Sequence, residues 1–169
     1  MRYFLIGFMG SGKSYWAKCW SEAFDLPLVD LDAAIEAQAG QSIPQIFERK
    51  GELYFRKLER EVLRKCFKQD HFIMSCGGGT PCYFDNMEQM NKRGITIYLK
   101  ATPEILASRL RDEKTVRPLI KDIPDDRLIP FIEQKLESRK RDYSKSFYHL
   151  DTQYLSNENF ERIIRRHGS

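Results

Sequence analysis

The feature that most constrains this chain is a glycine-rich loop between a short apolar segment and a stretch of helical period. Gly7 to Ser14 read G-F-M-G-S-G-K-S and match the pattern G-x-x-x-x-G-K-[ST]. Glycines let the backbone turn its N–H groups inward around a phosphate, and the first turn of the following helix adds unpaired N–H groups. The alternative, a glycine-rich turn with a chance lysine, does not explain this position between a strand and a helix. We therefore predict a polyphosphate site here.

Within that loop, several residue types have an expected task. Lys13 is predicted to reach the β- and γ-phosphates of a nucleotide, and the Ser14 hydroxyl is predicted to bind Mg²⁺. The nucleotide contacts predicted for this segment are Gly10, Ser11, Gly12, Lys13, Ser14 and Tyr15. Such a loop indicates a nucleotide but no particular reaction, because GTPase switches, ATPases and small-molecule kinases all contain it.

Short apolar runs alternate with longer stretches of helical period along the whole chain. The predicted strands, most of them apolar throughout as buried parallel strands are, cover 3–7, 26–30, 72–76, 95–100 and 148–151. The predicted helices cover 13–24, 32–39, 52–68, a segment that begins with Pro103 after the cap Thr102, and a last segment from Ser156 to Gly168. This alternation is typical of an α/β fold in which helices cover a five-stranded parallel sheet. With 169 residues, the chain is expected to form one domain, 1–169.

One segment, 111–126, departs from the alternation. It carries Pro118 and Pro124 among closely spaced acidic and basic residues, so we predict a long charged loop, of a length that is usually mobile. A helix is expected after it. Pro130 leaves the start of that helix open, because a proline is tolerated only in the first turn of a helix.

Charge and cysteine patterns exclude several classes of function. Lys and Arg number 28 against 24 Asp and Glu, and basic residues gather in 109–121 and 139–145 without the interleaved aromatic residues that single-stranded nucleic acids need. We expect local binding of anions and no nucleic-acid partner. The apolar stretches are too short for a membrane helix, and the four cysteines have neither metal-binding nor disulfide spacing, so a cytoplasmic protein is expected.

Two carboxylates follow the second predicted strand. Asp30 and Asp32 emerge at its carboxyl end, the edge at which α/β sheets bind ligands. The period of two along a strand would direct both to one side, so that one carboxylate serves Mg²⁺ and the other orients an attacking hydroxyl. Alternatively, Asp32 simply caps a helix that begins at Ala33.

Beyond these aspartates, the motifs resemble those of shikimate kinases. The resemblance runs from residue 5 to about residue 143 and rests on Val29-Asp30-Leu31-Asp32 with Ile35-Glu36, Ser42-Ile43, Ile46-Phe47, Gly51-Glu52, Phe55-Arg56, Leu58-Glu59, Gly77-Gly78-Gly79 and Thr115-Val116-Arg117-Pro118-Leu119. It implies a three-layer P-loop NTPase fold, like that of nucleoside monophosphate kinases, with a mobile lid at about 111–126. It also implies transfer of the ATP γ-phosphoryl group to the 3-hydroxyl of shikimate in aromatic amino-acid biosynthesis.

The resemblance further implies roles for particular residues. Asp32 matches the family aspartate at the shikimate hydroxyls and is the candidate base, while Asp30 matches the one associated with Mg²⁺. Arg117 matches the lid arginine that covers ATP, so the predicted catalytic set is Asp32, Lys13 and Arg117. The positions that match the family's contacts to shikimate are Asp32, Arg56, Gly78 and Arg139.

The chain departs from the family pattern at two places. The family's R-x-P-L-Y is here Arg139-Lys140-Arg141-Asp142-Tyr143. Arg141 is therefore an alternative ligand for the substrate carboxylate, although the spacing to Tyr143 favours Arg139. Tyr15 stands where the family commonly has threonine, and its bulk is expected to alter nucleotide packing without removing a phosphate contact.

The predicted function is therefore that of a monomeric, Mg²⁺-dependent kinase whose substrates are ATP and shikimate. A gluconate or nucleoside monophosphate kinase would share the phosphate loop, core and lid, but Asp32, Arg56 and the triple glycine argue against both. A nucleotide switch that only binds and hydrolyses is the alternative outside small-molecule kinases. A complete anion pocket at the acceptor position and the short chain argue against it.

Overall fold

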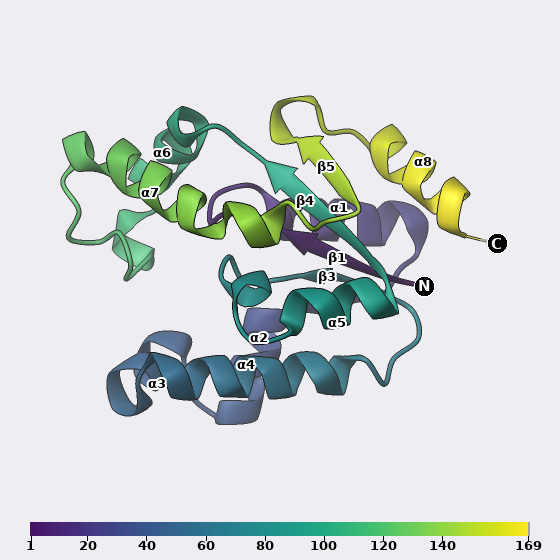
Figure 1. Cartoon of the computed structure of the whole chain (residues 1–169), viewed down its shortest axis with the longest axis horizontal. Coiled ribbons are helices and arrows are strands. Elements are labelled where there is room, and N and C mark those ends of the chain that lie inside the picture. Colours follow the sequence, from purple (N-terminus) through teal and green to yellow (C-terminus); the bar gives the residue numbers. More distant parts are fainter. Residues whose placement is uncertain (169) are drawn as a thin grey trace.

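The computed structural model describes residues 1–168 and contains one parallel sheet between layers of helices (Figure 1). Its strands are β1 (Arg2–Ile6), β2 (Leu28–Asp30), β3 (Phe72–Ser75), β4 (Ile95–Lys100) and β5 (Tyr148–Asp151). They lie in the order β2-β3-β1-β4-β5, and every neighbouring pair is parallel. The five predicted strands and the α/β class are confirmed, with small shifts in the ends of three strands.

Eight α-helices lie within the described chain. They are α1 (Lys13–Phe24), α2 (Leu31–Ala39), α3 (Ile43–Lys50), α4 (Glu52–Cys66), α5 (Asn86–Arg93), α6 (Pro103–Arg111), α7 (Asp125–Tyr143) and α8 (Asn157–His167). Single 3₁₀ turns are η1 (Thr80–Cys82), η2 (Lys114–Val116) and η3 (Thr152–Tyr154). Thr102 caps α6 as predicted, because its hydroxyl accepts from the backbone N–H of Ile105. Within residues 1–168, no helix is both long and apolar enough to cross a membrane.

Alternating side chains of β1 build a separate core on each face of the sheet. Tyr3 and Leu5 lie in the cluster made with α1 and α8, whereas Phe4 and Ile6 lie in the cluster made with α2, α3, α4 and α5. In the first cluster, the rings of Trp20 and Phe160 stack with centroids 4.7 Å apart. The predicted burial of the central strands on both faces is therefore confirmed, and helices cover each face.

A third apolar cluster lies beyond the carboxyl ends of the strands and fixes α6 and α7. Phe8 of the phosphate loop packs there with Leu110 of α6 and Leu128 of α7. The segment between these helices joins the same cluster through Ile120, which is fully buried, while Val116 and Leu119 are 74% and 57% exposed. The predicted charged loop is confirmed in outline. It contains the turn η2, and its last residues already belong to α7.

The start of α7, which Pro130 left open in the sequence, is at Asp125, so Pro130 lies inside the helix and not in its first turn. A proline lacks the N–H that would bind the carbonyl four residues earlier, here that of Asp126. Both Pro130 and Asp126 are exposed, so water can bind that carbonyl. The proline is therefore tolerated deeper in this helix than the general rule predicts.

Candidate active site

The phosphate loop connects β1 to α1, as its pattern predicts. Its backbone closes on itself through a hydrogen bond from the N–H of Ser11 to the carbonyl of Phe8, 3.1 Å long. Gly12 precedes α1 with φ of 90°, a left-handed conformation that favours glycine. No side chain of the described residues caps this helix, so the N–H groups of its first turn remain available to an anion.

Lys13 lies at the centre of the loop with its ammonium turned onto the backbone. Nζ donates to the carbonyls of Gly7 at 2.8 Å and Phe8 at 2.9 Å, and the residue is only 9% exposed. Burial lowers the pKa of Lys13 to about 8, while the Asp32 charge opposes that lowering. The charges of Arg117 and Arg139 also act on this ammonium. The structure therefore brings Asp32 and two of the three predicted arginines, Arg117 and Arg139, within electrostatic reach of Lys13.

The two aspartates lie in a different local structure from the predicted one. The strand β2 ends at Asp30 and α2 begins directly at Leu31, so Asp32 belongs to a helix and the period of two does not apply. Asp30, rather than Asp32, caps this helix, because its Oδ1 accepts from the N–H of Ala33 at 3.1 Å. The alternative in which Asp32 is a helix cap is therefore wrong.

The Asp32 carboxylate lies beside the triple glycine. A Cβ added to Gly77 would be 3.2 Å from Asp32 Oδ1. Although the residue is open to solvent, many protein atoms surround its carboxyl group. This desolvation raises the pKa of Asp32, the charge of Asp30 raises it further, and Lys13 opposes both. A carboxylate with a raised pKa is a better proton acceptor than an ordinary one.

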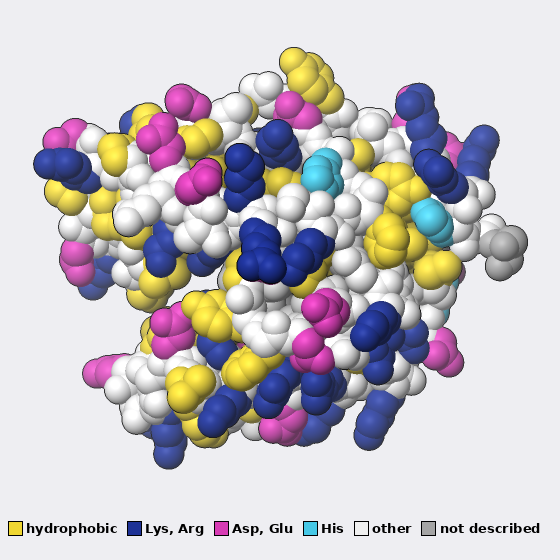
Figure 2. Space-filling model, viewed as in Figure 1, with side chains coloured by type: hydrophobic (Ala, Val, Ile, Leu, Met, Phe, Trp, Pro, Cys, Tyr) yellow, Lys and Arg dark blue, Asp and Glu magenta, His cyan; other side chains and the backbone are white. Residues whose placement is uncertain are grey.

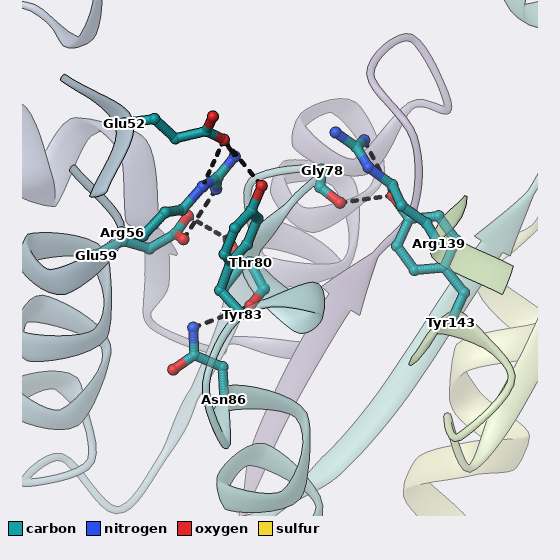
Figure 3. Close-up of polar contacts among 9 residues, drawn as sticks. All are labelled: Glu52, Arg56, Glu59, Gly78, Thr80, Tyr83, Asn86, Arg139 and Tyr143. Atoms are coloured by element: carbon teal, nitrogen blue, oxygen red, sulfur yellow. Dashed lines mark hydrogen bonds and ion pairs between the residues drawn. The ribbon is translucent and has the colours of Figure 1, made fainter. Parts of the chain in front are cut away.

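Arg56 is buried and held by a carboxylate on its own helix. Its Nη1 donates to Glu59 Oε1 at 3.0 Å, and Glu59 also accepts from the hydroxyl of Thr80 at 2.8 Å (Figure 3). Burial lowers the pKa of Arg56, but its hydrogen bond and ion pair with Glu59, together with Tyr83 and Glu52, outweigh burial, so the pKa of the guanidinium is raised. Arg56 is only 8% exposed, so it is not the solvated helix residue that its basic neighbours in sequence suggest.

The triple glycine lies between the two arginines predicted to hold a carboxylate. A Cβ on Gly79 would be 2.6 Å from Arg56 Nη2, and a Cβ on Gly78 would be 3.1 Å from Arg139 Nη1. The same Cβ on Gly78 would also be 3.5 Å from the backbone N of Met9 in the phosphate loop. Missing side chains therefore let both guanidinium groups and the phosphate loop approach one turn, which a merely flexible turn would not require.

The structure distinguishes between Arg139 and Arg141. The Arg139 guanidinium lies 5.3 Å from the ring centroid of Phe8 and donates to Tyr143 Oη at 3.5 Å. Tyr143 is buried and donates in turn to the carbonyl of Gly78 at 2.6 Å (Figure 3). Arg141 is exposed to solvent. The spacing argument that favoured Arg139 therefore agrees with the geometry.

The remaining predicted residues lie at the rim of the site. Arg117 lies in the 111–126 segment and pairs with Glu113. The Ser14 hydroxyl is 3.3 Å from that of Ser75 at the end of β3. Tyr15 is 66% exposed and packs edge-on against Trp16, with ring centroids 5.4 Å apart, so its ring is not buried against the loop.

Sequence reasoning missed two residues of this region. Arg109 of α6 donates to the carbonyl of Gly10 at 3.0 Å. The one feature of the sequence that could have indicated this contact is the place of Arg109 in the basic cluster 109–121. Glu59 binds Arg56, and its spacing of three residues on the same helix was a signal that could have been used.

The residues present fit a magnesium ion. Within residues 1–168 no group of three or more His, Cys, Asp or Glu side chains forms a protein-only metal site. Mg²⁺ beside nucleotide phosphates needs only one or two protein ligands and keeps several waters. The Ser14 hydroxyl and the second oxygen of Asp30, which the helix N–H does not use, are oxygen atoms of the kind that such an ion could take as ligands.

Figure 2 shows a notch in the surface on the side of the strands' carboxyl ends, between α6 with α7 and α3 with α4. The phosphate loop, Asp32 and the glycine turn come from the strand ends that face this notch. An anion-binding loop thus faces a second site in which two arginines and one carboxylate surround a glycine turn. Chemically, the arrangement can hold a polyphosphate against a hydroxylated carboxylic acid.

Comparison with known proteins identifies relatives along almost the whole chain. The family model described as "Shikimate kinase" matches residues 9–167. A shikimate kinase of Bacteroides fragilis is 40% identical over 148 residues, which cover 88% of this chain and 83% of that protein.

Solved structures give the same result. The crystal structure of shikimate kinase from Bacteroides thetaiotaomicron superposes with a TM-score of 0.90 at 36% identity and covers 98% of this chain and 97% of that one. The shikimate kinase of Acinetobacter baumannii in complex with shikimate has a TM-score of 0.85 at 28% identity and covers 98% of this chain and 90% of that one. The fold, including the sheet and its surrounding helices, is thus that of solved shikimate kinases.

Proposed function

Since this chain belongs to the shikimate kinase family, we propose that it transfers the γ-phosphoryl group of ATP to the 3-hydroxyl of shikimate, as a step of aromatic amino-acid biosynthesis. The family membership makes it an ATP-dependent kinase that acts on a shikimate hydroxyl. The observation that carries the residue assignments is the position of the glycine turn, which contacts Arg56 on one side and Arg139 and the phosphate loop on the other.

The acceptor is held through its carboxylate. Arg56 and Arg139 come from α4 and α7, and their guanidinium groups occupy the space that a side chain would take at Gly79 and Gly78, respectively. Two planar guanidinium groups can share one carboxylate through charge-assisted hydrogen bonds, which the point charge of a lysine does not reproduce. Gly78 leaves room for the acid to approach the backbone, and Tyr143 fixes the position of that glycine.

Asp32 orients the acceptor hydroxyl and takes up its proton. Its raised pKa and its place beside Gly77 support this role. Lys13 lies within electrostatic reach of Asp32, so the proposed proton acceptor is close to the proposed phosphate-binding ammonium. Positioning of the hydroxyl against the phosphate is expected to supply most of the catalysis, as is general for phosphoryl transfer.

On the nucleotide side, Lys13 leaves the carbonyls of Gly7 and Phe8 and binds the β- and γ-phosphates. The other proposed nucleotide contacts are Gly10, Ser11, Gly12, Ser14, Tyr15 and, from the lid at about 111–126, Arg117. Ser14 and Asp30 would hold Mg²⁺, which when bound neutralises phosphate charge. Closure of the lid excludes water, which would otherwise accept the phosphoryl group.

A monomer in the cytoplasm is part of the proposal. Every proposed site residue comes from one chain, so no partner chain is needed to complete the site. ATP as the phosphoryl donor is consistent with the cytoplasm.

Alanine substitutions at Arg139 and Arg141 test the acceptor site. Arg139→Ala should raise the KM for shikimate about tenfold or more and leave the KM for ATP almost unchanged, because a charged hydrogen bond to the acid is lost. Arg141→Ala is the matched control from the exposed face of the same helix and should leave both constants unchanged. A rise in the KM for shikimate with Arg141→Ala alone would contradict the assignment.

A further inference from the structure

Three consecutive residues after the glycine turn contact three arginines that lie one helical turn apart on α4. The pairs are Tyr83 with Arg56, ring centroid to Cζ 4.0 Å; Phe84 with Arg60, 4.1 Å; and Asp85 with Arg64, Oδ1 to Nη2 3.2 Å. We call Tyr83 to Asp85 the docking segment. It joins the loop that carries the glycines to the helix that carries Arg56, so it fixes the distance between two parts of the proposed acceptor site.

The backbone of the docking segment is strained in a way that favours this pairing. Phe84 has φ of 52°, in the left-handed region that is costly for a residue with a side chain. Such a conformation persists only where surrounding contacts enforce it. Here the contacts on either side of Phe84, from Tyr83 and from Asp85 to the same helix, provide that constraint. The position of Tyr83 against Arg56 is therefore set by the fold.

Two carboxylates compete for Arg56 in unequal ways. Glu59 is buried and binds Nη1 at 3.0 Å, whereas Glu52 is half exposed and its Oε1 lies 3.5 Å from both Nε and Nη2. That same Oε1 accepts a hydrogen bond from the hydroxyl of Tyr83, 2.8 Å long (Figure 3). The tyrosine thus engages the oxygen that would otherwise form a close ion pair with the outer edge of the guanidinium.

We propose that Tyr83 is a positioning residue that holds Glu52 in a loose contact with Arg56 and so keeps Nη2 of this guanidinium, rather than the buried Nε, available to the carboxylate of the substrate. The proposal rests on the assigned role of Arg56 in the proposed function. Glu59 supplies the permanent partner that a buried guanidinium needs, and Glu52 supplies only a loose contact that an incoming acid displaces. Tyr83 sets this difference through one hydrogen bond, while its ring stacks on the guanidinium.

Removal of the hydroxyl should therefore turn Glu52 into a competitor of the substrate. In Tyr83→Phe the ring and its stacking remain, but Glu52 is released and pairs more closely with Arg56. The dissociation constant for shikimate should rise about fivefold, the size expected from one redirected hydrogen bond to a charged group. In the double variant Tyr83→Phe with Glu52→Gln, the competitor has no charge and affinity for shikimate should return to within about twofold of the wild type.

Isothermal titration of shikimate into the full chain, with steady-state kinetics on the same samples, tests the proposal. The variants are Y83F, E52Q, Y83F with E52Q, and R56K. The matched control is Y54F, which removes the hydroxyl of a half-exposed tyrosine on α4 outside this contact. Y83F should weaken the binding of shikimate and raise the KM for shikimate. Its kcat and its KM for ATP should stay near those of the wild type. E52Q and Y54F should each bind shikimate as well as the wild type.

The variants distinguish a failure of the proposal for Tyr83 from a failure of the proposed function on which it rests. If R56K leaves shikimate binding unchanged, Arg56 does not hold the acid and the proposed acceptor site is wrong. If R56K weakens binding but Y83F does not, the role of Tyr83 is overturned while the acceptor site stands. If Y83F weakens binding and E52Q fails to restore it, Tyr83 does not act through Glu52 and the proposal is likewise overturned.

Discussion

Lys13 is indispensable for the proposed reaction, yet its charge destabilises the empty protein. Burial lowers its pKa from an ordinary 10.5 to about 8. At about 1.4 kcal/mol for each pKa unit, this lowering corresponds to about 3 kcal/mol of destabilisation whenever the folded ammonium must stay charged. Lys13→Met removes the charge and keeps much of the length of the side chain. It should abolish phosphoryl transfer because the phosphate loop itself then has no cation to bind the β- and γ-phosphates.

The sign of the pH dependence follows from which state releases the proton first. Below about pH 8 both the folded and the unfolded chain carry the Lys13 proton, and the buried charge destabilises the folded wild type in full. Between about 8 and 10.5 the folded chain loses that proton while the unfolded chain keeps it, so the wild type gains stability relative to Lys13→Met. Above 10.5 the cost is gone. Lys13→Met also loses the two hydrogen bonds from Nζ to the Gly7 and Phe8 carbonyls, which offsets part of the stability gained by removing the buried charge.

Urea unfolding without nucleotide measures this difference. The free energy of unfolding of Lys13→Met minus that of the wild type should fall by about 2 to 3 kcal/mol from about pH 7 to about pH 10. Lys18→Met removes an exposed lysine from the same helix and corrects for the general effect of losing one charge. A difference between the Lys13 variant and the wild type that is the same at both pH values would refute the claim that burial depresses this ammonium.

Three further predictions concern the glycine turn, the lid and α7. Gly79→Ala, at a φ of −91° that suits alanine, places a methyl group 2.6 Å from Arg56 Nη2 and should raise the KM for shikimate about tenfold in steady-state assays; an unchanged KM would contradict the role of Arg56. Ile120→Ala removes a fully buried anchor and should lower the free energy of urea unfolding by about 2 to 4 kcal/mol. The exposed Leu119→Ala is its control, and equal losses would disprove the anchor. Tyr143→Phe removes the donor to a partly buried carbonyl of the turn and should cost about 0.5 to 1.5 kcal/mol in thermal unfolding, which an unchanged Tm would exclude.

The spacing of apolar residues, together with the glycines and prolines between elements, predicted most of the fold. The central strands are mostly apolar because they are buried on both faces, and the long helices have apolar residues along one face. The short helices α3 and α5 escaped prediction, since each has only eight residues. For α3 a signal was present, because Ser42 and Gln45 form a reciprocal capping box. For α5 the only apolar positions on its face are Met87 and Met90, too few to reveal a period.

The sequence indicated which residues lie together at the carboxyl ends of the strands, but not their local geometry. The phosphate loop carries its own structural context, so Lys13 lies where the pattern places it. Asp30 ends β2 as predicted, but the expected strand period between the two aspartates was wrong, because α2 begins at Leu31 without a connecting loop. The contact of Tyr83 with Arg56 depends on the left-handed backbone of Phe84, which no sequence pattern indicates for a bulky residue. Contacts between distant segments of this kind become visible only in the folded chain.

The most direct test of the central claim, that the phosphate loop faces a site built for a carboxylic acid with a hydroxyl, is an ADP-release assay with parallel acceptors. Shikimate, gluconate and AMP are offered separately to the full chain with MgATP. We expect rapid turnover with shikimate and, with the other two, no ADP release beyond that measured without an acceptor. Turnover with AMP or gluconate but not with shikimate, or slow ATP hydrolysis that is indifferent to every acceptor, would contradict the account.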